Sequence, residues 1–426
     1  MAITDQITNS LKLFLKKHPV SRLWVAYSGG LDSTVLLHAL AKNIKLLPAI
    51  KLRAIHINHS INAQADIWQA HCADFCASLG VDYYSKNVFL DPRSSKSIEM
   101  QAREQRYQVF ENIILPGDGL VLAHHLDDQV ETVLLRLVKG SGIKGLAAMK
   151  SARTFAHGYL FRPFLNIPRD HLVEYAKQHQ LKWVEDTSNQ DLQYERNFLR
   201  NEILPKLKER WPQVGNNIRR TAENCAESEQ LLEMLLADTL IRCQGQHLDT
   251  LSITQLKQLD DKAQRQVIRC WLDKLGFRLP SRKKIQQLQH DMLYSAYDRN
   301  PVIAWEGVEL RRYQDELYAM PPLEPHDFKS IIPWDLQTRL VLPSGVVNLL
   351  PEHISGLEIN LRSLQNTTIR FRQGGEIGVW RGHKHSLKKL FQEWKVPPWL
   401  RNRVPLLYSN NELIAAILPN TIFLLK

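Results

Sequence analysis

Residues 27–34 read YSGGLDST and join two apolar segments of the chain, LWVA at 23–26 and VLLHAL at 35–40. The first segment indicates a short buried strand and the second indicates a helix. The glycine pair between them allows a tight turn and leaves no Cβ between the backbone and an anion. The first N–H groups of the following helix point at the same place. The stretch therefore predicts a phosphate-binding loop, although the lysine of a Walker A loop is missing.

The polar residues of this loop indicate how it would hold phosphates. Ser28 and Ser33 offer hydroxyl donors to phosphate oxygens. Asp32 is unexpected at this position, because phosphates repel a carboxylate unless a positive charge lies between them. We therefore expect Asp32 to bind a magnesium ion. The alternative is that the glycines form an ordinary turn and that Asp32 or Ser33 only caps the helix.

The segment from about 20 to 165 alternates between strand-like and helix-like patterns. We predict strands at 22–27, 51–58, 82–89, 119–124 and 158–162, and helices at about 33–44, 62–79, 98–113 and 127–138. This alternation predicts a doubly wound α/β domain, in which helices cover both faces of a parallel sheet. Ligands bind such sheets beyond the carboxyl ends of the strands, so the glycine pair and the segment 124–128 should meet in one crevice.

The remainder of the chain predicts two smaller domains. A helical stretch from 166 ends at Trp211-Pro212, and 215 to about 318 has mostly helical apolar spacing. The segment 320–325 is rich in proline and predicts a linker, and the short apolar runs after it favour a small α+β module. We therefore predict a catalytic domain at 1–213, a helical middle domain at 214–325 and a C-terminal domain at 334–426.

Composition favours a polyanionic partner. The 426 residues carry a formal net charge of +11, which is typical of proteins that bind nucleic acid. A basic protein that is merely kept soluble by its charge could have the same net charge. The positions of the charged residues are therefore more informative than their sum. No apolar run is long enough to span a bilayer, and the N-terminus lacks a signal-peptide pattern. Five scattered cysteines indicate reduced thiols, and we expect a cytoplasmic protein.

The pattern SGGxDS at 28–33, placed after a first strand, resembles the signature of the PP-loop, or N-type, ATP pyrophosphatases. The resemblance implies that the loop grips the pyrophosphate end of ATP while a nucleophilic oxygen attacks the α-phosphorus. It also explains the missing lysine, because a Walker lysine serves transfer of the terminal phosphoryl group. The ATP-binding residues implied in this way are Ser28, Gly29, Gly30, Leu31, Asp32 and Ser33.

Longer segments indicate which members of that superfamily the chain resembles. EMQAREQRY (99–107), AHHLDDQVET (123–132), KGSG (139–142), WVEDTSN (183–189), YERNFLR (194–200) and VPPWLR (396–401) resemble the tRNA(Ile)-lysidine synthetase family. The resemblance implies that ATP adenylates the C2 oxygen of the first anticodon cytidine in an isoleucine tRNA with a CAU anticodon. Free L-lysine then displaces AMP and forms lysidine.

The same resemblance assigns roles to single residues. It implies that Asp32, Arg103, His124 and Asp128 are catalytic and that Asp128 and Glu131 bind lysine. Asp128 and Glu131 are three residues apart and so share one face of a helix. Two acids at this place could also bind a magnesium ion, or they could form a solvated acidic helix start that the helix dipole favours.

Other polar residues near these positions have simpler interpretations. Arg103 by itself could be a surface residue, His125 a packing residue and Asp127 an N-cap. The attack by lysine needs a deprotonated nitrogen, and no residue is assigned to that task from the sequence.

Two basic regions are candidates for binding tRNA. Residues 370–403 contain nine Lys and Arg against two Glu, with aromatic residues between them, and a second cluster runs from 196 to 220. Positive side chains neutralise phosphates, and aromatic rings stack on exposed bases. For Phe391 and Trp394, which have helical spacing, we expect a place in the core instead. The predicted tRNA-binding residues are Arg196, Arg200, Arg370, Arg372, Arg381, Lys384, Lys388, Lys389, Trp399 and Arg401.

Two other interpretations stay open at this point. Another PP-loop tRNA-modifying enzyme, such as a thiolase, would have the same loop. Thiolating members typically use paired catalytic cysteines or a metal cluster, whereas Cys72 and Cys76 have the spacing of an ordinary helical core. A non-catalytic RNA-binding protein that retains a nucleotide-sensing loop would need none of Asp32, Arg103 and Asp128. The sequence does not fix the oligomeric state, and a homodimer is compatible with it.

Overall fold

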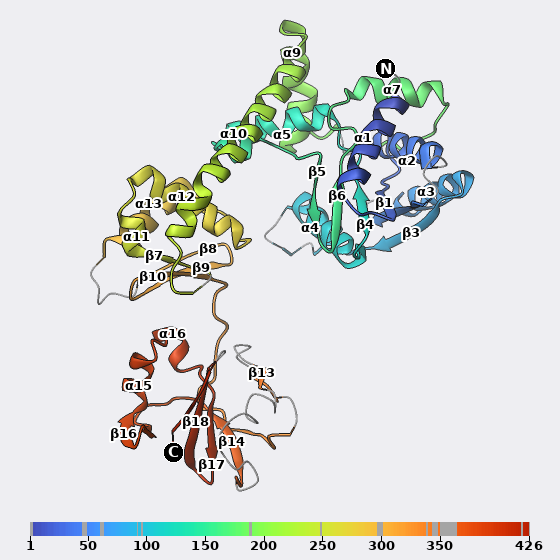
Figure 1. Cartoon of the computed structure of the whole chain (residues 1–426). Coiled ribbons are helices and arrows are strands. Elements are labelled where there is room, and N and C mark those ends of the chain that lie inside the picture. The colour runs from blue at the N-terminus through green and yellow to red at the C-terminus, as the bar shows by residue number, and fades with distance from the viewer. Residues whose placement is uncertain are drawn as a thin grey trace. The chain divides into compact units, whose positions relative to one another are not determined.

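The computed structural model describes residues 3–44, 49–59, 64–91, 93–94, 97–186, 190–247, 249–295, 301–337, 340–342, 348–349, 364–418 and 421–425. The chain divides into two compact units, 1–232 and 233–426, and the division falls within the long helix α10 (Val214–Arg242) (Figure 1). The three domain ranges remain a prediction. The last three residues of the segment 183–189 and the first two of the helix expected at 62–79 lie outside the described residues.

The first unit is built around a six-stranded sheet with the order β3-β2-β1-β4-β6-β5. Its parallel strands are β1 (Arg22–Ala26), β2 (Lys51–Asn58), β3 (Asp82–Asn87), β4 (Asp118–Val121) and β6 (Gly158–Phe161). The edge strand β5 (Ala152–Phe155) is antiparallel and was not expected. The mostly parallel sheet confirms the predicted α/β fold.

Helices cover both faces of this sheet (Figure 1). On one face lie α1 (Ile3–Lys17), α2 (Leu31–Ile44), α3 (Ala65–Leu79) and α7 (Arg169–Gln178), which share a core with Leu23 and Val25. On the other face α4 (Ile98–Ile113) contributes Phe110 to a core with Trp24. Successive residues of β1 therefore face opposite layers, as the pleat of a strand requires.

The order of the strands places one crevice at the carboxyl ends of β1 and β4. β1 pairs with β2 on one side and with β4 on the other, so the chain reverses its winding direction there. The loop 27–30 follows β1, and α5 (Leu126–Val138) follows β4. Because parallel strands end at the same edge, both segments reach the same crevice.

The chain leaves this sheet through a series of short helices. These are α6 (Ile143–Leu146), α8 (Glu195–Phe198), the π-helical turn η2 (Leu199–Ile203) and α9 (Leu204–Arg210). Leu204 packs on Leu126 and Val130 of α5, which holds the segment 195–210 beside the crevice. The helical stretch expected from 166 to 210 is thus present only in part, since residues 181–186 have no regular structure.

The middle segment combines helices with an antiparallel sheet. Its helices are α11 (Ile253–Lys257), α12 (Asp261–Lys274) and α13 (Arg282–Leu288), followed by the π-helical turn η3 (Gln289–Leu293). The sheet has the order β7 (Thr250–Ser252), β10 (Glu316–Met320), β9 (Val308–Tyr313) and β8 (Val302–Trp305). The helices agree with the apolar spacing, but the sheet was not expected.

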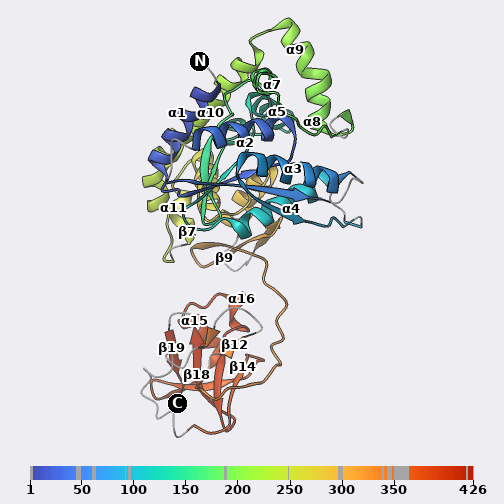
Figure 2. The same ribbon diagram turned by 90° about the vertical axis from the view of Figure 1, so that its right-hand side faces the viewer.

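The C-terminal residues form the small α+β module that the sequence predicts. The antiparallel sheet contains β11 (Ile332–Pro333), β14 (Thr367–Arg370), β17 (Leu406–Ser409), β18 (Glu412–Leu418) and β19 (Thr421–Leu424). Two further pairs are β12 (Leu340–Val341) with β13 (Asn348–Leu349), and β15 (Ile377–Trp380) with β16 (His383–Ser386). The helices are α15 (Leu387–Glu393) and α16 (Pro398–Arg401) (Figure 2). Phe391 and Trp394 belong to the core, as expected.

Within the described ranges, no helix combines the length and the apolar content that crossing a membrane requires.

Candidate active site

The loop after β1 depends on one glycine with a left-handed backbone. Gly29 has a φ of +85°, a conformation that residues with a side chain rarely adopt. A Cβ at this position would also lie 2.9 Å from Cys72 Sγ on α3. Its carbonyl oxygen accepts a hydrogen bond of 2.9 Å from Val184 N, which ties the loop to the segment 183–186. Both backbone conformation and space therefore require glycine here.

Serine hydroxyls close the loop onto the first turn of α2. Ser28 N donates to Ser33 Oγ at 3.2 Å, and the two hydroxyl oxygens are 3.0 Å apart. Ser33 Oγ in turn donates to the carbonyl oxygen of Gly30 at 3.0 Å. Because α2 begins at Leu31, its first N–H groups, which have no partner within the helix, lie at this loop. The arrangement suits an anion such as a phosphate.

A cavity of about 200 Å³ joins the loop to the residues after β4. The meeting of loop and segment 124–128 that the sequence predicts is therefore confirmed. Four residues predicted to act on ATP, Ser28, Gly30, Asp32 and Ser33, line the cavity together with His124 and Asp128. The other lining residues are Ala26, Arg106, Tyr107, Phe110, Leu122 and Ala123.

Asp32 lies in the first turn of α2, and its side chain is 30% exposed. Its Oδ2 is 3.7 Å from His125 Nε2, and its Oδ1 is 3.5 Å from Arg169 Nε. Oδ1 is buried and has no hydrogen-bond partner among the described residues. This oxygen caps no backbone amide, so the carboxylate is available to a cation.

His125 lies among three carboxylates. Its side chain is 2% exposed, and Nε2 is 3.4 Å from Asp128 Oδ2, while Nδ1 is 3.9 Å from Asp127 Oδ2. Burial opposes a charged imidazole, but the carboxylates of Asp32, Asp128 and Asp127 outweigh it and raise the pKa of His125. His125 is therefore an electrostatic partner of the acids and not only a packing residue.

His124 lines the cavity as a neutral imidazole. Burial lowers its pKa to about 3, and Arg162 and Arg106 act in the same direction, against the effect of Asp128. Arg162 Nε donates to His124 Nδ1 at 3.3 Å. Because a guanidinium only donates, Nδ1 must accept and the ring proton is on Nε2. At neutral pH His124 is therefore a hydrogen-bond donor and not a base.

The two acids on α5 bind an arginine. The side chain of Glu131 is fully buried, and Arg200 Nε and Nη2 donate to its two oxygens at 2.7 and 3.1 Å. Arg200 Nη2 also lies 3.2 Å from Asp128 Oδ1. Burial raises the pKa of Glu131 although Arg200 opposes this. The pair is therefore not a solvated helix start, and the guanidinium of Arg200 points inward.

Asp127 does not cap α5. Its Oδ2 accepts a hydrogen bond of 3.0 Å from Arg169 N, and its Oδ1 accepts one of 2.8 Å from Lys208 Nζ. The acid thus ties the start of α5 to α7 and α9.

Two arginines of α4 have different surroundings. Arg106 lines the cavity. Arg103, expected to be catalytic, is exposed, and its guanidinium carbon lies 5.1 Å from the centroid of the Tyr107 ring. The structure thus brings Arg106 to the cavity and leaves Arg103 outside it. The only signal for Arg106 in the sequence was its place in the same segment, 99–107, and nothing marked Arg162 or Arg169.

Matches with known proteins agree with this geometry. The PP-loop domain family matches residues 3–207, the TilS substrate binding domain matches 251–318, and the TilS substrate C-terminal domain matches 367–418. The tRNA(Ile)-lysidine synthase of Coxiella burnetii is 42% identical over 400 residues, which cover 93% of this chain and 88% of that protein. The chain belongs to the tRNA(Ile)-lysidine synthase family.

Other members of the tRNA(Ile)-lysidine synthase family match over similar lengths. The protein of Legionella pneumophila strain Lens is 41% identical over 400 residues, covering 93% of this chain and 90% of the relative. That of Histophilus somni strain 2336 is 39% identical over 428 residues, covering 98% of each. These matches confirm the resemblance carried by the sequence motifs, and they identify the chain as a PP-loop enzyme of tRNA modification.

The cysteines of the chain do not favour the thiolase alternative. Burial raises the pKa of Cys72 and of Cys76 to about 12, so neither is a ready thiolate. The five cysteines, all of them in described parts of the chain, form no disulfide. Among the described residues, no group of three or more His, Cys, Asp or Glu could hold a metal ion.

The residues expected to bind tRNA have different surroundings. Arg196 and Arg200 lie beside the acids of α5, and Arg196 Nη2 is 3.4 Å from Thr132 Oγ1. Arg370 and Arg372 donate to Asn411 and Asn402 within the C-terminal module. Arg381, Lys384, Lys388 and Lys389 are exposed. Trp399 and Arg401 contact the sheet of the middle segment.

Proposed function

We propose that this chain ligates L-lysine to C2 of the first anticodon cytidine of an isoleucine tRNA with a CAU anticodon, at the expense of ATP. The products are lysidine, AMP and pyrophosphate, and the tRNA changes its codon and amino-acid specificity from methionine to isoleucine. The observation that carries the proposal is that one cavity is lined by the PP-loop, by Asp32 and by Asp128. Activation and transfer on one cytidine need both groups within reach of the same atom.

The first step forms the adenylated cytidine. The C2 carbonyl oxygen attacks the α-phosphorus of ATP, and the bond from this phosphorus to the bridging oxygen of the pyrophosphate breaks. We assign the pyrophosphate to the first N–H groups of α2 and to the hydroxyls of Ser28 and Ser33. Arg106, which lines the cavity, is better placed than Arg103 to stabilise negative charge on the reacting phosphate.

Asp32 fits a magnesium ion that enters with ATP. Magnesium is usually held by one or two carboxylates together with substrate phosphates and water. Asp32 Oδ1 is buried without a hydrogen-bond partner among the described residues, and Arg169 Nε lies 3.5 Å from it, so the surroundings of this oxygen favour a cation. When bound, the ion would neutralise phosphate charge, and His125 would keep the carboxylate oriented from 3.7 Å.

The second step transfers lysine. Its ε-amino nitrogen attacks C2, and the bond from C2 to the AMP oxygen breaks. We assign an ammonium group of lysine to Asp128 and Glu131, where it would replace the guanidinium of Arg200 on at least one carboxylate. The attacking nitrogen must first lose a proton. His124 is not the base, because its Nδ1 already accepts from Arg162 and its pKa is about 3.

The partner implied by these steps is a folded tRNA with its anticodon base unstacked. Sequence-specific recognition of RNA usually targets such exposed bases, while basic surfaces hold the phosphates. Lys384, Lys388 and Lys389 are exposed on the C-terminal module and suit this second task. A cytoplasmic location and a homodimer also remain proposals, which cell fractionation and light scattering would test.

A single assay tests the proposed reaction. The purified chain is incubated with ATP, labelled lysine and an unmodified isoleucine tRNA with a CAU anticodon. We expect lysine to enter the tRNA with equimolar release of AMP. The matched control is the same tRNA with its first anticodon cytidine replaced by uridine, which should incorporate no lysine. Incorporation of sulfur, or binding of tRNA without release of AMP, would support the two alternative functions instead.

A further inference from the structure

The C-terminal segment 395–401 packs against the sheet of the middle segment, and both belong to the second compact unit. Trp399 of α16 lies against two tyrosines of this sheet. Its ring centroid is 5.3 Å from that of Tyr318 and 6.3 Å from that of Tyr313, with interplanar angles of 76° and 83°. The guanidinium carbon of Arg311 lies 5.4 Å from the Trp399 ring centroid. These are the edge-to-face and cation–π geometries of a packed aromatic contact.

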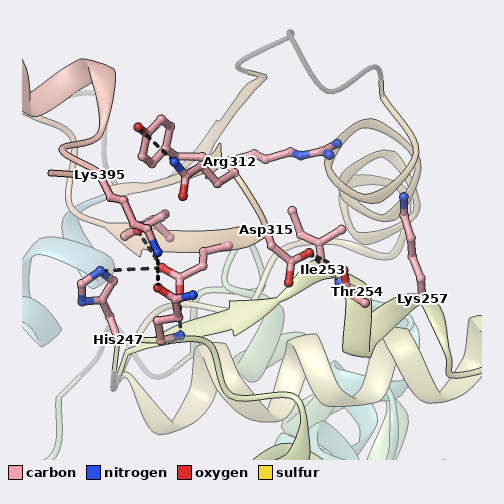
Figure 3. Close-up of a pocket in the computed structure, with 12 residues that line it drawn as sticks. His247, Ile253, Thr254, Lys257, Arg312, Asp315 and Lys395 are labelled. Atoms are coloured by element: carbon pink, nitrogen blue, oxygen red, sulfur yellow. Dashed lines mark hydrogen bonds and ion pairs between the residues drawn. The ribbon is translucent and has the colours of Figure 1, made fainter. Parts of the chain in front are cut away.

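Hydrogen bonds surround this aromatic contact. Arg401 Nη2 donates to the hydroxyl oxygen of Tyr313 at 3.2 Å, and Arg401 Nε donates to Val396 O at 2.9 Å. Lys395 Nζ donates to Gln246 Oε1 at 3.3 Å. Figure 3 shows Lys395 beside a cavity of about 410 Å³ that Tyr313 and Tyr318 also line. Three side chains of the C-terminal module thus meet partners on the middle segment.

This contact occupies two of the residues that were expected to bind tRNA. The indole N–H of Trp399 is buried and has no hydrogen-bond partner among the described residues, so it is not presented to an RNA. The guanidinium of Arg401 already donates to Tyr313 and to Val396. Lys388 and Lys389 on α15, by contrast, are exposed. The basic segment 370–403 therefore contains residues that pack against the middle segment and lysines that are exposed to solvent.

We propose that Lys395, Trp399 and Arg401 form a joint that docks the C-terminal module on the middle sheet, and that Trp399 and Arg401 act there and do not contact RNA. The joint holds the exposed lysines of the module in one position relative to the middle segment. A fixed position lowers the entropy that binding of a long substrate would otherwise cost. This consequence rests on the proposed tRNA substrate, whereas the docking itself does not.

Limited proteolysis of the full-length protein without RNA tests the docking. Residues 321–331 connect the middle segment to the C-terminal module and are largely exposed. If the joint opened, a protease would reach them more easily. We expect Trp399→Ala to speed cleavage in this segment by about tenfold, because its opening no longer has to break the aromatic contact. X-ray scattering should show a larger radius of gyration for the same variant. The Lys388→Ala/Lys389→Ala double variant is the matched control and should be cleaved at the wild-type rate.

A second variant keeps this test valid if Trp399→Ala does not fold. Tyr313→Phe retains the ring and removes only the oxygen that accepts from Arg401, so it should fold and show a smaller increase in cleavage. A thermal melt verifies the folding of each variant. The proposed docking would be refuted if folded Trp399→Ala were cleaved at the wild-type rate. It would also be refuted if both Tyr313→Phe and Arg401→Gln were cleaved at that rate.

The salt dependence of tRNA binding separates docking from RNA contact. Arg401→Gln should weaken binding while leaving the slope of log K against log salt unchanged. Lys388→Ala/Lys389→Ala should lower that slope by about one for each lysine removed. A lower slope for Arg401→Gln, together with unchanged cleavage, would show that Arg401 contacts RNA and would refute the proposal. If the wild-type chain bound no tRNA, the proposed function would fail while the proteolysis result would still decide the docking.

Discussion

We expect the activation step to depend on the negative charge of Asp32. Its buried Oδ1 has no hydrogen-bond partner among the described residues, and His125 holds its other oxygen. Asp32→Asn keeps the shape of the side chain and removes its charge. We expect AMP formation to fall by at least about a hundredfold, as on loss of other electrostatic catalytic groups. Release of AMP from labelled ATP measures this, with tRNA binding as the control. A comparable loss of tRNA binding would instead indicate that Asp32 is structural.

Asp128 and Glu131 should act on lysine more than on ATP. Removing the charge of Asp128 weakens the site that Arg200 now occupies, but leaves the loop 28–33 unchanged. We expect Asp128→Asn to raise the KM for lysine and to slow its transfer by about a hundredfold, with adenylation slowed by less than about tenfold. Exchange of labelled pyrophosphate into ATP, which requires tRNA but no lysine, reports adenylation alone. Equal losses in both half-reactions would argue against lysine recognition.

Buried neutral histidines should make the fold sensitive to acid. Burial, with smaller effects of Lys42 and His179, lowers the pKa of His38 to about 4, and burial lowers that of His59 to about 4. Between about pH 6.5 and 4 the unfolded chain binds protons that the folded chain does not bind, so the free energy of unfolding falls across this window. His38→Gln should flatten that dependence in urea titrations at pH 7, 5.5 and 4.5. An unchanged pH dependence would mean that His38 binds its proton over the same pH range in the folded and the unfolded chain.

At the scale of elements, the segments that carry local signals could be predicted from the sequence. The strand 22–26 and the helix 31–44 follow from apolar runs on either side of a glycine pair. The three strands between residues 302 and 320 could not be predicted in this way. Arg312 occupies an inward position of β9 and breaks the apolar alternation. Arg312 is tolerated there since its Nη1 donates to the carbonyl oxygens of Met292 and Ser295. Only the folded structure supplies those partners.

The candidate site, too, could be predicted from the sequence only in part. The meeting of the loop with His124 and Asp128 follows from the rule that parallel strands end at one edge. The positions of Arg106, Arg169 and Arg200 do not follow from any local pattern. They stand on helices far apart in the chain, and the direction of a long side chain depends on which acids lie within its reach. The sequence therefore predicted Arg200 only as a residue that binds tRNA, which stays a prediction, and did not show that its guanidinium binds Glu131.

The connection between β1 and α2 should tolerate no side chain at Gly29. Gly29→Ala forces alanine into a left-handed backbone and places its Cβ against Cys72 Sγ. We expect the free energy of unfolding to fall by about 1–3 kcal/mol, together with a higher KM for ATP. The double variant Gly29→Ala/Cys72→Ala should recover part of the stability, because it removes the contact but not the backbone strain. Urea unfolding measures the stability of both variants. If Gly29→Ala were as stable as the wild-type protein, the loop would relax without cost around the new side chain.

At the scale of the whole molecule, the net charge of +11 is larger than the positive charge that is free to bind RNA. Several basic side chains neutralise acids of the protein itself, as Arg200 does with Glu131 and Lys208 with Asp127. Others bond within their own domain, as Arg372 does with Asn402. The exposed lysines of the C-terminal module are a smaller set, and they lie on a different compact unit from the cavity around Asp32. Binding of tRNA and chemistry should therefore be separable by mutation.

Replacing Lys384, Lys388 and Lys389 together by Gln tests this separation. Each lysine that neutralises a phosphate releases a counterion, so the slope of log K against log salt should fall by about three in the triple variant. The KM for tRNA should rise, while kcat for lysine transfer at saturating tRNA should stay within about twofold, since the cavity around Asp32 is untouched. The matched control replaces two lysines on α13 of the middle segment, the exposed Lys283 and the half-buried Lys284. This change should leave the slope nearly unchanged if the C-terminal module provides the main phosphate contacts. A fall in kcat with an unchanged slope would show that these lysines act on the chemistry through the fold and not through the RNA.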